Sequence, residues 1–238
     1  MRREPAFVVS CEHASARVPA TWRAVLRDYL PLCDEHEVRD PGIGEIGREL
    51  AGLLEAPYFP GTFTRLLVDL NRSINHPELF SPPVRELPAR ARTDILCEYY
   101  HPYRHRVRQE IENLVAADRP VIHLSIHSFT PELHGRKRRN DFGLLFDPWR
   151  KGEDELAEPW LHLLRRRAPD LICTPNEPYT GTSDGHVPVL RRYLRRASYL
   201  GYELEFNQKL PLSRNAPAYA RWIQRTLRAA LASHPARL

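Results

Sequence analysis

Short hydrophobic runs alternate along this chain with longer stretches in which hydrophobic residues recur every three or four positions. The short runs predict buried β-strands, and the longer stretches predict amphipathic helices. The predicted strands are Ala6–Cys11 and residues 65–70, 121–126, 142–146, 171–173 and 199–206. The predicted helices are residues 40–54, 98–117, 153–167, 189–196 and 216–232. We expect Pro102 to break the second helix early and Pro159 to bend or interrupt the third, and we expect the Pro/Arg-rich residues 81–92 to form an irregular loop.

The order of these elements indicates the fold class. Strands that alternate with helices favour an α/β protein with a largely parallel sheet. We therefore predict a three-layer α/β/α fold with a mixed, largely parallel sheet. The 238 residues contain no internal repeat and no linker-like stretch, and domains run to about 250 residues. This predicts a single domain over residues 1–238.

Composition excludes several classes of protein. With 42% hydrophobic and 27% charged residues, the chain is not expected to be disordered. No hydrophobic run approaches the roughly 20 residues of a membrane-spanning helix. The first hydrophobic run is too short for a signal peptide, so we expect a cytoplasmic protein. The four cysteines are far apart, which argues against a disulfide framework and against a cysteine zinc site.

The charge balance raises the question of an anionic partner. The chain has 35 basic and 30 acidic residues, and 32 of the basic residues are arginines. Basic clusters occur at residues 136–139, 165–167 and 191–196, but the other arginines are scattered among carboxylates. This distribution favours a solvated surface. The alternative is a non-catalytic protein that binds nucleic acid or another anion, with an affinity that falls steeply as salt rises.

Polar residues follow several predicted strands. In open α/β sheets, ligands bind beyond the carboxyl ends of the strands. The residues at these positions are Glu12, His13, Asp69, Asn71, Arg72, His127, Glu203 and Glu205. Two histidines and one carboxylate, with a fourth position open to water, form a common catalytic zinc set. Each feature also has a structural interpretation: His13 as a hydrogen-bonding histidine, residues 69–72 as a salt-bridged turn, and Glu205 as part of a buried ion pair.

Six short motifs stand out along the chain. The first is Val-Ser-Cys-Glu-His-Ala-Ser-Ala-Arg-Val-Pro at residues 9–19. Asp-Leu-Asn-Arg at residues 69–72 and His-Ser-Phe-Thr-Pro at residues 127–131 belong to the motifs at residues 64–72 and 126–131. The others lie at residues 40–44, 176–181 and 203–208. Together these motifs resemble those of the N-formylglutamate amidohydrolase family, over residues 7–210. Some of these motifs are also similar to those of zinc carboxypeptidases and aspartoacylases, which implies a zinc carboxypeptidase-like fold.

The resemblance implies a role for each residue of a zinc site. His13 and His127 would be zinc ligands, with one Zn²⁺ per chain, and Glu205 would be the general base. Zinc carboxypeptidases place a carboxylate ligand three residues after the first histidine, where this chain has Ala16. Asp40 would therefore supply the carboxylate, with Glu12 as the alternative. Asp40 followed by Pro41 is equally typical of a helix N-cap.

The same resemblance implies the substrate contacts. Asn71 and Arg72 would hold the free α-carboxylate of the substrate, since an arginine fork binds a carboxylate bidentately. Arg65 would add a second positive charge or polarise the scissile carbonyl. Tyr179 would line the pocket, although it is as readily a packed loop tyrosine, and His186 with the loop 181–185 would recognise substrate. His101, His105 and His123 are assigned to structure or surface.

Together these expectations describe a zinc-dependent amidohydrolase. N-formyl-L-glutamate, cleaved to L-glutamate and formate, is the first candidate substrate. The alternatives are another N-acyl amino acid deacylase or a carboxypeptidase-like peptidase on the same scaffold. The expected partner is a small N-acyl amino acid with a free carboxylate, and neither nucleic acid nor a membrane is expected.

Overall fold

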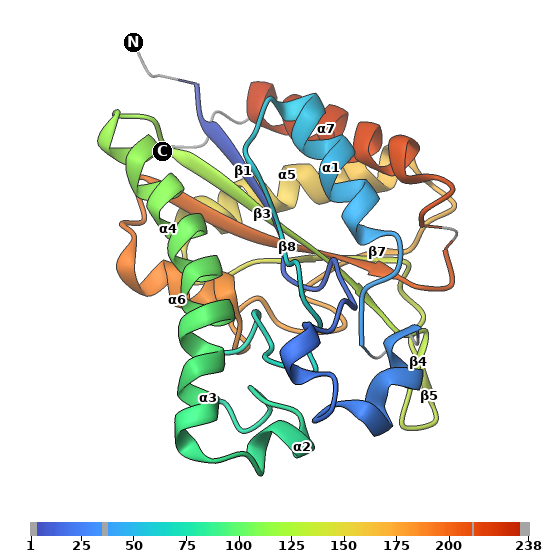
Figure 1. Cartoon of the computed structure of the whole chain (residues 1–238). Coiled ribbons are helices and arrows are strands. Elements are labelled where there is room, and N and C mark those ends of the chain that lie inside the picture. Colours follow the sequence, from blue (N-terminus) through green and yellow to red (C-terminus); the bar gives the residue numbers. More distant parts are fainter. Residues whose placement is uncertain (1–3, 35–37, 211, 234–238) are drawn as a thin grey trace.

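A six-stranded sheet forms the centre of the protein (Figure 1), in a computed structural model that describes residues 4–34, 38–210 and 212–233. The strand order is β2-β1-β3-β8-β6-β7, and neighbours are parallel except at the β8–β6 boundary. The strands are β1 (Ala6–Cys11), β2 (Tyr58–Pro60), β3 (Val121–Phe129), β6 (Phe142–Leu145), β7 (Cys173–Pro175) and β8 (Tyr199–Asn207). A separate hairpin pairs β4 (Glu132–Leu133) with β5 (Arg136–Lys137). The mixed, largely parallel sheet predicted from the sequence is confirmed.

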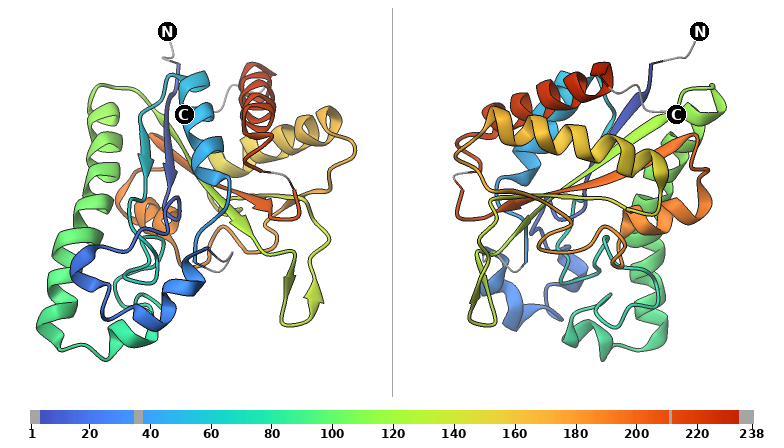
Figure 2. Two further views of the ribbon diagram at one scale, coloured as in Figure 1. Left: turned by 45° about the vertical axis from the view of Figure 1, so that its right-hand side comes forward. Right: turned by 180° about the vertical axis from the view of Figure 1, so that it is seen from behind.

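Helices cover both faces of the sheet (Figures 1 and 2). The α-helices are α1 (Ile43–Leu54), α2 (Pro82–Arg85), α3 (Ala89–Ile95), α4 (His101–Ala116), α5 (Lys151–Arg167), α6 (His186–Tyr193) and α7 (Ala216–Ser233). Two 3-10 segments, η1 (Ala20–Trp22) and η2 (Arg27–Asp34), and a π-helical turn, η3 (Leu96–Tyr100), complete the elements. The helices α1, α5 and α7 pack on one face, while α4 and α6 lie on the other. This is the predicted three-layer arrangement.

The two faces of the central strands differ in polarity. On β3, Ile122, Leu124 and Ile126 point into the hydrophobic core beneath α1, α5 and α7. The alternate residues His123, Ser125 and His127 therefore point to the opposite face. On β8, Glu203 and Glu205 lie in register with Ser125 and His127. The carboxyl half of this face thus carries a row of buried polar side chains.

The prediction of a strand at residues 65–70 is wrong. This segment contains turns and forms no strand, and β2 occupies the place beside β1. Its hydrophobic residues Leu67, Val68 and Leu70 instead pack into the core on the α4 side of the sheet. Residues 69–72 therefore belong to a loop on the α4 side of the sheet and do not follow a strand.

Proline-containing segments differ in part from the predictions. Residues 81–92 contain α2 and the start of α3 rather than an irregular loop, because prolines are tolerated in a first helical turn. Pro102 lies in the first turn of α4, and Pro159 lies within α5 without interrupting it. Among the described residues, none of the helices combines the length and hydrophobicity that crossing a bilayer requires. The single domain expected over residues 1–238 stays a prediction.

Candidate active site

Three buried side chains converge at the carboxyl end of the central strands. His13 follows β1, His127 lies near the end of β3, and Asp40 precedes α1. Asp40 Oδ2 is 3.2 Å from His127 Nδ1 and 3.6 Å from His13 Nδ1, and the three candidate ligand atoms lie within 4.8 Å of one another. Ligand atoms bound to a tetrahedral zinc at about 2.0–2.1 Å are about 3.3 Å apart. The group can therefore hold a small metal cation.

The outer nitrogen of the His13 ring is fixed by a carboxylate. His13 Nε2 lies 2.7 Å from Asp69 Oδ1, and because a carboxylate only accepts, this nitrogen carries the proton. Asp69 also accepts hydrogen bonds from Arg65 (2.5 Å) and from the backbone N–H of Asn71 (2.9 Å). Burial opposes its charge, but Arg65 and His13 hold the pKa of Asp69 below its ordinary range. The lone pair of His13 Nδ1 is thereby left facing Asp40.

A second carboxylate fixes His127 in the same way. His127 Nε2 lies 2.9 Å from Ser125 Oγ and 3.2 Å from Glu12 Oε2, and Ser125 Oγ donates to the same Glu12 oxygen over 2.7 Å. The other oxygen, Glu12 Oε1, accepts from His186 Nδ1 at 2.9 Å. A carboxylate that orients a histidine through its outer nitrogen is the usual partner of a metal-bound histidine. Glu12 thus lies behind His127, outside the group of converging donors.

Asp40 is directed to β3 and does not cap α1. The N-cap position of α1 is Gly42, and no side chain caps this helix. Asp40 Oδ2 instead accepts a hydrogen bond from the backbone N–H of Ser128 at 3.0 Å. Of the two carboxylates that the sequence left open as ligands, Asp40 is the one that belongs to the converging group.

The converging donors favour positive charge between them. Burial opposes the charge of Asp40, but His127 and His13 hold the pKa of Asp40 below its ordinary range. Burial likewise opposes a charged His127, but Asp40 and Glu12 raise the pKa of His127 well above its ordinary value. A metal cation can supply this positive charge in place of the ring protons, since histidine binds metals as the neutral imidazole.

Glu205 lies beside this group with an unused oxygen. It is in register with His127 on the neighbouring strand and is 7% exposed, and Glu205 Oε2 has no hydrogen-bond partner among the described residues. Burial raises the pKa of Glu205 to about 7. On its other side, Gly143 of β6 lies in register with Glu205. A Cβ at residue 143 would collide with the carbonyl oxygen of Glu177, so this close approach requires glycine.

Arg72 also has unused donors. Its Nε is buried without a partner among the described residues, and its other contacts are 3.5 Å to the carbonyl of Asp184 and 3.5 Å to Glu78. Both contacts are long for charge-assisted hydrogen bonds, which are usually about 2.7–2.9 Å. The guanidinium is therefore available to a carboxylate. Asn71 is more committed, because its Oδ1 accepts from the backbone N–H of His186 at 2.7 Å.

Tyr179 lies on a loop that is fixed at both ends. Asn176 Oδ1 accepts from the backbone N–H groups of Phe146 (3.0 Å) and Gly181 (2.9 Å). Arg138 lies over the Tyr179 ring, 5.0 Å from its centroid, and donates to its hydroxyl at 3.2 Å. The tyrosine is 42% exposed and lines the site, so it is not simply a packed loop residue.

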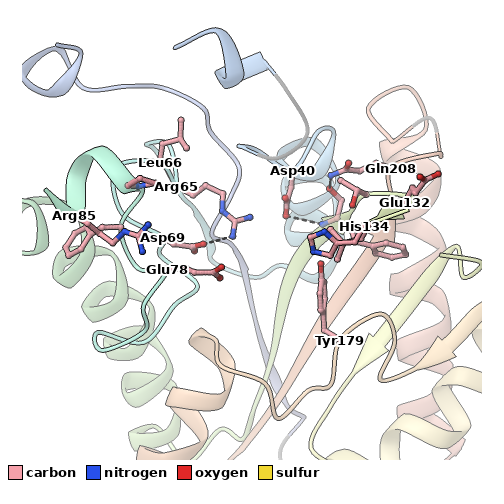
Figure 3. A pocket seen from close by; sticks show the side chains of 16 residues that line it. Asp40, Arg65, Leu66, Asp69, Glu78, Arg85, Glu132, His134, Tyr179 and Gln208 are labelled. Atoms are coloured by element: carbon pink, nitrogen blue, oxygen red, sulfur yellow. Dashed lines mark hydrogen bonds and ion pairs between the residues drawn. The ribbon is translucent and has the colours of Figure 1, made fainter. Parts of the chain in front are cut away.

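A cavity of about 140 Å³ brings the predicted residues together. All eight predicted site residues line it: His13, Asp40, Arg65, Asn71, Arg72, His127, Tyr179 and Glu205. This cavity adjoins a larger one of about 620 Å³ (Figure 3). The two cavities share Asp40, Arg65, Asp69, Ser128 and Tyr179 as lining residues. Figure 3 shows Arg65 and Asp69 on one wall of the larger cavity, with Asp40 and Tyr179 across from them.

Sequence reasoning missed the residues that hold the histidines. Asp69 belongs to the Asp-x-Asn-Arg motif, in which the resemblance implies roles only for Asn71 and Arg72. Ser125 lies two residues before His127, on the same face of β3, so strand alternation is the signal that identifies it. His186 was expected to contact substrate, but it is buried and braces Glu12 without lining the smaller cavity. His123 is buried between Ser10 and Tyr199.

These features define an α/β protein with a buried two-histidine, one-carboxylate group at the edge of its sheet, beside a free carboxylate and an arginine. Residues 6–212 match a family model described as N-formylglutamate amidohydrolase. The chain therefore belongs to the N-formylglutamate amidohydrolase family, as its motifs indicated. No curated protein sequence matches the chain.

Two known structures share the fold over nearly the whole chain. The gene product Atu2144 from Agrobacterium tumefaciens is 27% identical, with a TM-score of 0.83, over 96% of this chain and 91% of that protein. The N-formylglutamate amidohydrolase from Ralstonia eutropha JMP134 is 18% identical, with a TM-score of 0.69, over 96% of this chain and 94% of that protein. The predicted fold class is thus also seen in related proteins.

Proposed function

We propose that the protein is a zinc-dependent amidohydrolase that cleaves the amide bond of an N-acyl amino acid. N-formyl-L-glutamate is the first candidate substrate. The observation that carries this proposal is the convergence of His13, Asp40 and His127 next to the unpartnered oxygen of Glu205. Family membership supports the reaction class, because the family is one of amidohydrolases.

The residues present suit a zinc ion. Two imidazoles and one carboxylate form a donor set that catalytic zinc sites use, with a fourth position left for water or substrate. When bound, zinc supplies Lewis acidity and lowers the pKa of water to about 7. Asp69 and Glu12 keep the ring protons of His13 and His127 on the outer nitrogens, so that the inner nitrogens are free to bind the ion.

Glu205 is the proton carrier of the proposed reaction. It takes a proton from water while the water oxygen forms a bond to the acyl carbon. The C–N bond then breaks, and Glu205 returns the proton to the leaving amine nitrogen. The products are a carboxylic acid and a free amino acid. An oxygen without a competing hydrogen-bond partner is suited to this transfer.

Arg72 and Arg65 are the proposed substrate contacts. Arg72 binds the α-carboxylate through its unused donors. Asn71, whose Nδ2 lies 3.4 Å from His127 Nε2, lines the same cavity and is the proposed second contact. The contact with Arg72 fixes the amide relative to Glu205, and positioning of this kind contributes to rate. Arg65 lines both cavities, and its Nη2 donates a hydrogen bond to Asp69 Oδ2. The other donors of Arg65 polarise the carbonyl of the scissile amide.

Metal analysis and a substrate screen test the proposal. The purified protein is expected to contain about one zinc per chain and to hydrolyse N-formyl-L-glutamate or a related N-acyl amino acid. A chelator is expected to abolish this activity, and added zinc is expected to restore it. Absence of bound metal, together with no hydrolysis of N-formyl, N-acetyl or dipeptide substrates in added zinc, would refute the proposal.

A further inference from the structure

The larger cavity next to the candidate metal group exceeds what a formyl group requires. Its volume is about 620 Å³, whereas the adjoining cavity with the converging donors, Glu205 and Arg72 has about 140 Å³. Pockets of roughly 300–1,000 Å³ hold ligands of drug size. A formyl group has two non-hydrogen atoms, and a water molecule takes about 30 Å³ in the liquid. Such a group leaves nearly all of the larger cavity unfilled.

The lining of the larger cavity combines five apolar side chains with charged and polar ones. Its apolar side chains are Leu66, Phe80, Pro82, Phe129 and Leu133. The first three come from the segment that ends at the start of α2, and the other two come from the end of β3 and from β4. The charged or titratable side chains Arg85, Glu132 and His134 are exposed, and Figure 3 shows Arg85 across the cavity from Glu132 and His134. The apolar side chains thus lie on two walls, and the buried carboxylates Asp40 and Asp69 lie where this cavity meets the smaller one.

We propose that the larger cavity is an acyl-binding site and that the preferred substrates are N-acyl amino acids with an apolar acyl arm longer than formyl, such as hexanoyl or phenylacetyl. This inference rests on the proposed amidohydrolase function. The apolar lining supplies the affinity, because burial of apolar surface is favourable by about 25 cal/mol per Å².

The positions of the charged groups decide which end of the substrate enters this cavity. Arg72 lines only the smaller cavity, so a substrate whose α-carboxylate binds there has its amino acid part in that cavity. Asp40 lines both cavities, which places the amide bond where they meet. The remaining substituent of the acyl carbon then continues into the larger cavity. The competing arrangement places the amino acid side chain there instead, and substrates distinguish the two.

A substrate series with matched variants tests the inference. The substrates are N-formyl-L-glutamate, N-hexanoyl-L-glutamate, N-phenylacetyl-L-glutamate and N-formyl-L-phenylalanine, and the assay measures the released amino acid. We expect kcat/KM for the hexanoyl or phenylacetyl compound to exceed that of both formyl compounds by at least about tenfold, since one methylene in an apolar pocket is worth about tenfold or more.

Leu133→Ala removes one apolar contact from the cavity. It is expected to lower the ratio of hexanoyl to formyl kcat/KM by about tenfold. Leu53→Ala is the matched control, because Leu53 is 38% exposed on α1 and Leu133 is 42% exposed on β4. The control is expected to leave the ratio at its wild-type value. Leu133→Trp narrows the cavity and is expected to discriminate against phenylacetyl more than against formyl.

Three results would overturn the inference while leaving the amidohydrolase function intact. These are a preference for N-formyl-L-glutamate, a preference for N-formyl-L-phenylalanine over the acyl compounds, and an equal effect of Leu133→Ala on every substrate. If no compound is hydrolysed, the proposed function is refuted. Calorimetry then measures whether N-hexanoyl-L-glutamate binds, which tests the acyl-binding site separately. Binding that Leu133→Ala weakens supports the site, and absence of binding overturns it.

Discussion

Replacing Glu12 with glutamine tests whether the partner of His127 sets the affinity for the metal. The side chain is buried, and its two oxygens have different partners: Oε1 accepts from His186, and Oε2 accepts from Ser125 and faces His127 Nε2 at 3.2 Å. Glutamine keeps the shape and can still accept from His186. The NH2 group of the glutamine then faces the Nε2–H of His127, so two hydrogen-bond donors meet without an acceptor. The ring is driven to move its proton to Nδ1, the atom that the metal requires.

The expected cost follows from the hydrogen bonds lost. A hydrogen bond to a charged group contributes about 1.5–3 kcal/mol, and each 1.4 kcal/mol changes a dissociation constant about tenfold. The Glu12→Gln variant is therefore expected to bind zinc about 10- to 100-fold more weakly. Outer partners of metal-bound histidines have effects of the same size, about 10- to 100-fold in metal affinity.

Competition with a fluorescent zinc chelator measures the effect without any substrate. Circular dichroism confirms that the variant is folded before the titration. Glu49→Gln is the matched control, because Glu49 is exposed on α1 and loses the same charge without touching the site. A zinc affinity of Glu12→Gln within about twofold of wild type, which is less than 0.5 kcal/mol, would refute the reasoning.

Three further predictions concern catalysis. Glu205→Gln is expected to lower kcat by about 10²- to 10⁴-fold with an unchanged zinc content by metal analysis, and a near-normal kcat would assign the base elsewhere. Arg72→Ala is expected to raise KM about 10- to 100-fold, since hydrogen bonds between charged groups are worth about 1.5–3 kcal/mol; the same substrate with an amidated carboxylate is the control, and equal losses for both substrates would contradict the clamp. Burial raises the pKa of Glu205 to about 7, and a cation beside it lowers this value towards the ordinary glutamate pKa of about 4.3. The base works when ionised, so kcat/KM is expected to be lost as pH falls through this window, and a flat profile between pH 4 and 8 would contradict the assignment.

Local sequence patterns identified the strands that are buried on both faces. Such strands are nearly continuous hydrophobic runs, as in β1, whose six residues are all buried. The hydrophobic pattern gave wrong predictions where buried residues do not pair in the sheet, or where paired residues are not buried. Leu67, Val68 and Leu70 are buried like strand residues but form no strand. The strand β2 has only three half-buried residues, so no hydrophobic run marks it. A hydrophobic run reports burial, and it does not report the backbone hydrogen bonds that define a strand.

The candidate metal ligands could be predicted from the sequence, but the carboxylates that orient the two histidines could not. His13 and His127 could be identified because side chains at or just beyond the carboxyl ends of parallel strands meet at one edge of a sheet. The carboxylates behind them, Asp69 and Glu12, act through contacts between residues distant in sequence, and no local pattern reports these contacts. The same limit applies to the arginine clusters. Arg191 belongs to the basic cluster at residues 191–196, which the sequence assigns to the surface, but its side chain is 6% exposed and forms an ion pair with the buried Glu153.

The three converging donors belong to chain segments that are distant in sequence, so a bound cation acts as a cross-link. It joins the end of β1, the segment before α1 and the end of β3. A ligand that binds only the folded chain stabilises it by about 2.7 kcal/mol when its concentration is 100 times its dissociation constant. The melting temperature of the protein is thus expected to rise with metal concentration. Thermal unfolding then reports occupancy of the site before any substrate has been identified.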